Sequence, residues 1–341
     1  MDGKNRLQPW FSKSNISKLM LKSSIGLENT PHSDHHHGER EAKLYGGQAV
    51  IEGVMMKGPS KAVVSVRAPD GKIVSQTIRE WTKSDSFSWK HLSFIRGIFV
   101  LVDSLTLGLA ALNYSAKIAL PEDEKPVNPF WENTIFLISI LLGVGIFVVL
   151  PTKLPEYLGL KQPGEILKAM DPHSIYLNLF EGGIRIIVFI GYIVGISFLK
   201  DIRRVFQYHG AEHKTVNAYE SRIPLTVENV QKLPTAHFRC GTSFIFIVAI
   251  IHILIASLFG WPPILIRIAT RILILFPVAS ISYELLRLSA KFHTNPISRI
   301  FFAPGLLFQK ITARQPEDSM VEVAIDAFRQ VIPEEELNAP Q

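Results

Sequence analysis

The chain has one cysteine, Cys240, in 341 residues, so an internal disulfide is excluded. Charged residues make up only 19% of the sequence, below the roughly 25% that is usual for soluble domains. The sequence contains no Ser-His-Asp arrangement, no Walker motif and no nucleic-acid-binding module. Residues 1–43 are charged and polar, and we expect no secretory signal peptide there. These absences argue against a disulfide framework, a soluble enzyme and a nucleic-acid partner.

Hydrophobic residues, in contrast, make up 47% of the chain, and its mean hydropathy is +0.21. Four segments are apolar over nearly the ~20 residues that cross a bilayer. They are residues 134–150, 184–199, 242–260 and 264–286. We therefore predict an α-helical polytopic membrane protein with a bundle of four transmembrane helices over residues 134–286, in contact with membrane lipid.

The segment at 87–119 is also apolar, but it carries Arg96 and Asp103. Each charge would cost about 2.5–3.5 kcal/mol at the centre of a bilayer. We therefore predict an interfacial or re-entrant helix there.

Basic residues set the expected orientation, because cytoplasmic loops of membrane proteins carry an excess of lysine and arginine. The loop 200–241 is rich in both, whereas segment 151–183 has three lysines among four acidic residues. An even number of spans then places both termini in the cytoplasm, in a multi-pass protein of the plasma or inner membrane. The net charge of +6 is consistent with a surface beside anionic lipid.

The segments outside the bundle have distinct compositions. Residues 1–43 form a basic arm with a histidine tract, expected to be disordered. Residues 44–85 combine a glycine-rich loop with two β-branched runs around Asp70-Gly71, which predicts a small cytosolic β-hairpin unit. In the cytosolic segment 287–341, the spacing of apolar residues predicts an amphipathic helix at 321–332.

The strongest chemical signal is His209-Gly-Ala-Glu212-His213, which has the order H-x-x-E-H. On a helix, His209 and His213 are one turn apart and share a face. In inverzincins, two imidazoles in this order hold zinc and the glutamate acts as the catalytic base. We therefore predict a divalent metal, zinc, bound by the two histidines with Glu212 as the catalytic residue. The alternative is a helix near the membrane whose histidines bond to phosphates or carbonyls.

Three residues are candidates for a further metal ligand: His237, Cys240 and Glu284. Imidazole, thiolate and carboxylate all bind zinc. Each also has a structural alternative, such as pairing of Glu284 with Arg287 or burial of Cys240 as a small side chain. Further site candidates are Glu52, Gln48 and Arg239. We expect these polar blocks to converge on one cytosolic site.

Seven ordered blocks resemble the bacterial YqhQ-like proteins, over about residues 44 to 330. The blocks are 45–56, 96–97, 113–116, 208–214, 239–243, 282–284 and 304–306. The resemblance implies an integral membrane protein of a family of unknown function, whose members are described as predicted metal-dependent enzymes.

Three functions remain open at this stage. The first is a metal-dependent hydrolase at the membrane–cytosol boundary, acting on a peptide or a lipid-linked substrate. The second is a non-catalytic scaffold or assembly factor that docks a membrane-protein partner, such as the protein-export or envelope machinery. The third is a small transporter with a polar path past Arg271 and Glu284.

Overall fold

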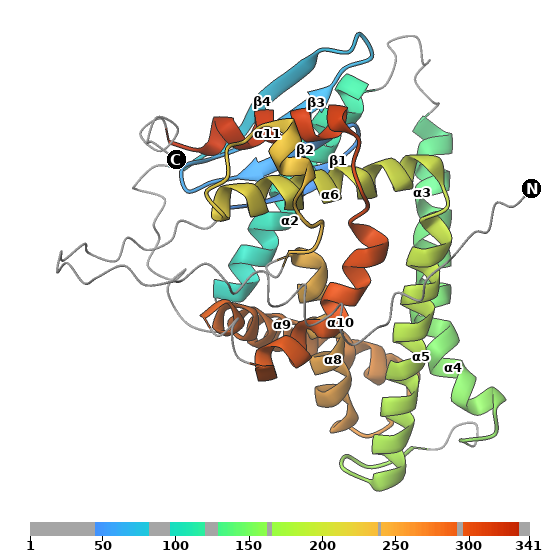
Figure 1. Ribbon diagram of the computed structural model, residues 1–341. Coiled ribbons are helices and arrows are strands. Elements are labelled where there is room, and N and C mark those ends of the chain that lie inside the picture. The colour runs from blue at the N-terminus through green and yellow to red at the C-terminus, as the bar shows by residue number, and fades with distance from the viewer. Residues whose placement is uncertain are drawn as a thin grey trace, which may run out of the picture. The chain divides into compact units, whose positions relative to one another are not determined.

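The structure is a computed structural model that describes residues 45–81, 96–119, 129–161, 166–237, 240–291 and 296–333 (Figure 1). The predicted arm at 1–43 and the site candidate Arg239 lie outside these residues. The described chain is mostly helical, with one small antiparallel sheet.

The sheet has four strands in the order β1-β2-β3-β4, each antiparallel to its neighbour. The strands are β1 (Gly46–Val50), β2 (Gly53–Lys57), β3 (Lys61–Arg67) and β4 (Ile73–Glu80). The Asp70-Gly71 turn joins β3 to β4, with Gly71 at φ 86°, where a glycine has no Cβ to clash. The predicted β unit is confirmed, and it has two more strands than the hairpin that the sequence indicated.

Both faces of the sheet are covered by helices. Alternate strand residues point to opposite faces, and β2 and β3 are buried almost throughout. One face, with Val54 and Val63, packs on α6 (Lys200–Glu220) and α11 (Asp318–Val331). The other face, with Met55 and Val64, packs on α2 (Arg96–Ala119). The helix α11 confirms the predicted amphipathic helix.

The remaining elements are α3 (Pro129–Val144), the π-helix η3 (Gly145–Val149), α4 (Leu150–Tyr157), α5 (Pro172–Ile196), α7 (Val227–Gln231), α8 (Gly241–Ser257), α9 (Ile264–Lys291) and α10 (Pro296–Thr312). Four helical stretches are long and apolar enough to cross a membrane: Arg96–Ala119, Thr134–Tyr157, Pro172–Ile196 and Ile264–Leu285. By length and composition, this is a membrane protein.

These four stretches are not the same four segments that the sequence predicts as spans. The stretch at 242–260 forms a shorter helix, because α8 ends at Ser257 and Gly260 turns the chain at φ 73°. The fourth helix with the length and hydropathy of a span is instead α2. One face of α2 nevertheless lies on the sheet, where Leu107 and Ala111 are buried.

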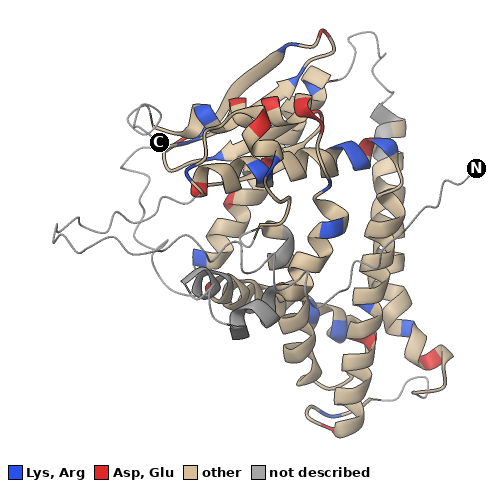
Figure 2. Ribbon diagram, in the orientation of Figure 1, with Lys and Arg blue, Asp and Glu red and all other residues tan. Residues whose placement is uncertain are grey.

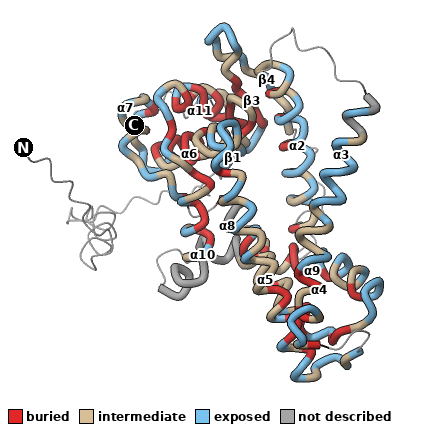
Figure 3. The backbone as a smooth tube through the Cα atoms, turned by 90° about the vertical axis from the view of Figure 1, so that its right-hand side faces the viewer, coloured by how far each residue is buried: buried red, intermediate tan, exposed pale blue. Residues whose placement is uncertain are grey.

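The surface of the bundle is apolar. In α3, Ile135, Phe136 and Leu141 are 59–67% exposed, and Figure 3 shows this helix mostly in the colour of exposed residues. Figure 2 shows charged residues gathered over the sheet, α6 and α11 and few along α3. Contiguous exposed apolar surface of this kind is what a lipid-facing helix has.

Candidate metal centre

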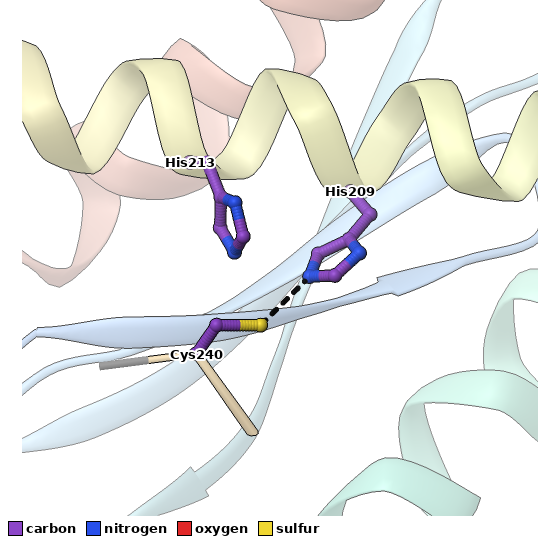
Figure 4. Close-up of side chains that lie close together, drawn as sticks. All are labelled: His209, His213 and Cys240. Atoms are coloured by element: carbon purple, nitrogen blue, oxygen red, sulfur yellow. Dashed lines mark hydrogen bonds between the residues drawn. The ribbon is translucent and has the colours of Figure 1, made fainter. Parts of the chain in front are cut away.

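The two histidines of the H-x-x-E-H motif lie on one face of α6 and point at the sulfur of Cys240 (Figure 4). Ligand atoms of His209, His213 and Cys240 all lie within 4.8 Å of one another. Cys240 directly precedes α8, so the cluster joins two elements that are separated in the sequence. Among the described residues, this is the group whose donor atoms have the spacing of a metal site.

The hydrogen bonds of the two imidazoles fix which nitrogen of each ring faces the sulfur. Nδ1 of His209 lies 2.7 Å from the carbonyl oxygen of Thr312, and Nδ1 of His213 lies 2.5 Å from that of Thr235. A carbonyl only accepts, so each Nδ1 carries a hydrogen and donates it. With the hydrogen on Nδ1, Nε2 is the ring nitrogen that can offer a lone pair to a metal.

The sulfur of Cys240 lies near both of these nitrogens. Its Sγ lies 3.2 Å from Nε2 of His209. Nε2 of His213 is buried without a partner at hydrogen-bond geometry among the described residues, and the nearby Cys240 raises the pKa of this ring against the larger, opposite effect of burial. A buried ring nitrogen in that state normally costs free energy.

A metal ion would remove that cost. Burial lowers the pKa of His213 and so favours its neutral, metal-binding form. Ligand atoms on a tetrahedral zinc lie about 3.3–3.8 Å apart. Nε2 of His209 and Sγ of Cys240, 3.2 Å apart, are close to this spacing, and the donor atom of His213 lies within 4.8 Å of both.

Close packing around α6 holds the cluster together. Gly210 lies so near the carbonyl oxygen of Arg314 that a Cβ at this position would collide with it. The N–H of Arg314 donates to the carbonyl of Phe206 at 2.8 Å. This contact joins the end of α10 to α6 and places the Thr312 carbonyl beside His209.

Side chains of α6 also hold the following loop, which carries Thr235 and leads to Cys240. Nζ of Lys214 donates to the carbonyls of Gln231 and Leu233, at 2.8 and 2.6 Å. Nδ2 of Asn217 donates to two further carbonyls of the same loop, those of Pro234 and Ala236. These hydrogen bonds from α6 side chains to backbone carbonyls fix the loop on the helix.

His237 lies beside the cluster, with its ring centroid 5.7 Å from that of His213. Its Nε2 faces a carboxylate oxygen of Glu220 at 3.3 Å, and its backbone bonds at both N–H and C=O to the side chain of Gln309. Burial lowers the pKa of His237. This residue is adjacent to the three donor atoms without being one of them.

Glu284 lies elsewhere. It forms a two-pronged ion pair with Arg96, which joins α9 to α2. An oppositely charged partner is what an ionisable group in an apolar helix requires. Among the three candidates for a further ligand, the structure therefore brings Cys240 to the histidines, sets His237 next to them and pairs Glu284 with Arg96.

Glu212 is 6% exposed and lies between α6 and β1, where it accepts a hydrogen bond from the backbone N–H of Gly47. A Cβ on Gly47 would lie 3.0 Å from Cγ of Glu212, so the glycine allows this close approach. Burial raises the pKa of Glu212, against the opposing effects of His209 and His237. A carboxyl whose pKa is raised by burial is a candidate for proton transfer.

Glu52 and Gln48 approach this region from the sheet. Glu52 forms a two-pronged ion pair with Arg204 of α6, at 2.5 Å for each oxygen, and accepts from Tyr208 at 3.3 Å. The hydrogen bonds from Arg204 hold the pKa of Glu52 below its usual range. The amide of Gln48 packs on Gly108 of α2. Both residues tie the sheet to helices and lie outside the donor cluster.

Comparison with known proteins gives two matches. A family model described as "Protein of unknown function (DUF1385)" matches residues 92–334. A Bacillus subtilis (strain 168) protein named "Uncharacterized protein YqhQ" is 33% identical over 292 residues, which is 84% of this chain and 92% of the relative. No solved structure matches the chain.

Proposed function

Because the chain belongs to the family described as "Protein of unknown function (DUF1385)", we propose its function from the geometry of the donor cluster. In this proposal the protein is a zinc-dependent hydrolase of the membrane surface. His209, His213 and Cys240 are the zinc ligands, and Glu212 is the general base. The observation that carries this proposal is the hydrogen bonding of the two imidazoles. Each Nδ1 is held by a backbone carbonyl, as in metal-binding histidines, and each Nε2 faces the sulfur.

Three protein ligands are the number that catalytic zinc sites have, since the fourth position is left for water or substrate. When bound, zinc supplies a Lewis acid and lowers the pKa of a water. The chain's own contribution is to orient the ligands through Thr312 and Thr235 and to move a proton at the carboxylate of Glu212. The position of the cluster between the sheet and the bundle favours a peptide or lipid-linked substrate at the membrane surface.

The test of catalysis replaces Glu212 by glutamine. This change keeps the size of the side chain and all three proposed ligands but removes the base, which typically contributes about 10²–10⁴-fold to a rate. We expect Glu212→Gln to retain zinc and to fail to complement a strain that lacks the protein. The matched control is Asp201→Asn, at an exposed carboxylate on the same helix, which should complement. Full rescue by Glu212→Gln would favour a non-catalytic scaffold.

We also propose that the cluster faces the cytoplasm and that both termini lie there. Helix α8 of 17 residues is about 25 Å long, from Cys240 at one end to Trp261 beyond the other. Trp261 pairs with Leu167, in the segment before α5. The start of α5, the end of α8 and the start of α9 therefore lie together, at the end of α8 that is distant from the cluster. The basic loop 200–241 lies at the other end, with the cluster.

Reporter fusions test this orientation. A reporter inserted after Arg222 should report the cytoplasm, and one inserted after Lys161 should report the opposite side, because α5 lies between the two positions. A fusion after Glu220 serves as an independent control for the same side as Arg222. A cytoplasmic signal from the Lys161 fusion would show that the proposed orientation is wrong.

A further inference from the structure

A second polar cluster lies within the bundle, at the end of α8 that is distant from Cys240. It contains three arginines, Arg185 of α5 and Arg267 and Arg271 of α9, which we call the arginine cluster. Arg267 and Arg271 are one turn apart on α9, and Arg271 bonds to Asn178 of α5, the helix that carries Arg185. Three cations gathered inside an apolar bundle require compensation, because charge is costly there.

Two of the three arginines have polar partners. Arg185 donates to Glu181 at 2.6 Å and to the carbonyl of Phe147 at 3.1 Å, in the π-helix η3. Arg271 donates to the side chain of Asn178 and, at 3.3 Å, to the carbonyl of Ala256. These bonds use mainly neutral acceptors, so they satisfy donors without cancelling charge.

Arg267 is the exception. It is 4% exposed, and its guanidinium lies 4.1 Å from the centroid of the Trp261 ring. Its Nε and Nη1 have no hydrogen-bond partner among the described residues. Buried guanidinium nitrogens without acceptors are expensive, and more so among apolar helices.

The charges in the cluster do not balance. Glu181 is the one carboxylate that pairs with the arginine cluster among the described residues, and one of its oxygens is also buried without a partner. Nearby, Glu156 pairs with two lysines, Lys153 at 3.0 Å and Lys161 at 3.9 Å. Among the described residues, three guanidinium groups therefore face one paired carboxylate, which leaves an excess of positive charge.

We propose that the arginine cluster binds the phosphate group of an anionic ligand, with Arg267 as its principal contact. A phosphate oxygen accepts strongly from a guanidinium N–H, so a phosphate beside Arg267 would satisfy a buried donor that lacks a partner among the described residues. It also supplies the missing negative charge. The site is about 25 Å from the metal centre along α8 and does not depend on it. Its phosphate comes either from an anionic lipid or from solution.

The experiment compares unfolding of the full chain in nanodiscs of phosphatidylcholine alone and of phosphatidylcholine mixed with phosphatidylglycerol. Each is measured with and without inorganic phosphate. We expect an anionic ligand to raise the unfolding midpoint of the wild type by about 5 °C. A rise with phosphatidylglycerol identifies the lipid as the source, and a rise with inorganic phosphate alone identifies a soluble anion.

Substitution of Arg267 by glutamine should change the unfolding midpoint, relative to the wild type, in different directions with and without an anionic ligand. Without an anion, Arg267→Gln removes an uncompensated charge and should leave the midpoint equal or higher than in the wild type. With phosphatidylglycerol or phosphate, the variant should lose the rise, whereas Arg222→Gln, at an exposed loop position, should keep it. A wild-type midpoint that neither anion changes, or an equal rise in Arg267→Gln, would overturn the proposal.

A second measurement covers the case in which Arg267→Gln does not fold. Mass spectrometry of the wild type purified from membranes, under conditions that retain bound lipid, should detect anionic lipid or phosphate in about a one-to-one ratio. Wild-type protein that carries neither, and whose midpoint neither anion changes, contradicts the proposal without any variant.

Discussion

Replacing His213 by alanine is expected to remove zinc from the purified protein, and replacing His209 by alanine or Cys240 by serine should do the same. Each change leaves two donors, too few for the three or four ligands of protein zinc sites. Loss of even an outer hydrogen-bond partner weakens metal binding about 10–100-fold, and loss of a direct ligand should exceed this. The measurement is elemental analysis of the wild type, at about one zinc per chain, against each variant.

Two controls make this result specific. Residues 1–43 are deleted in all proteins, because a histidine tract can bind metal adventitiously. His252→Ala removes another half-buried imidazole, from α8, whose Nε2 lies 3.2 Å from the carbonyl of Arg271, and it should keep full zinc content. His237→Ala distinguishes a three-ligand from a four-ligand site. Equal zinc in the wild type and in His213→Ala would exclude the proposed centre.

The part of the site that follows from residue spacing could be predicted from the sequence. His209 and His213 are four apart within a continuous helix, so the helix geometry alone places their rings on one face. Similarly, Asp70-Gly71 between β-branched runs predicts its turn, and the apolar spacing of α11 predicts its buried face. These are local features, determined by residues within one or two turns.

The choice between Cys240, His237 and Glu284 could not be made in this way, because it depends on tertiary contacts. The carbonyls of Thr312 and Thr235 belong to the backbone, so no residue type in the sequence marks them. The partner of Glu284 is Arg96, which lies 188 positions away on another helix. From the sequence alone, Arg96 indicated only that its segment is too polar to cross a membrane.

The classification of α2 and α8 shows the same limit. Hydropathy describes how apolar a segment is, and it does not distinguish an apolar face that meets lipid from one that meets a sheet. In α2, Asp103 pairs with Lys57 and Arg79 of the sheet, so the charge that argued against a span is explained by protein contacts. The end of α8 depends on the turn at Gly260, which the apolar run does not reveal.

Replacing Gly210 by alanine should destabilise the protein and weaken zinc binding together. The added Cβ collides with the carbonyl of Arg314, and this is a backbone atom that no side-chain rotation can move. Overpacking of this kind costs about 1–3 kcal/mol. Alanine gains at most about 1 kcal/mol over glycine in a helix, so the collision outweighs the propensity. The measurements are the unfolding midpoint in detergent and a zinc titration of the same samples.

Gly195→Ala is the matched control, since a Cβ at that position of α5 meets nothing within 4 Å. There alanine should leave both the unfolding midpoint and the zinc affinity unchanged, or raise the midpoint slightly. The two readouts are coupled at Gly210 because the helix has to move away from Arg314, and His209 then moves away from the Thr312 carbonyl that orients it. A Gly210→Ala variant that is destabilised but binds zinc with wild-type affinity would show that the carbonyl contact does not orient the ligand.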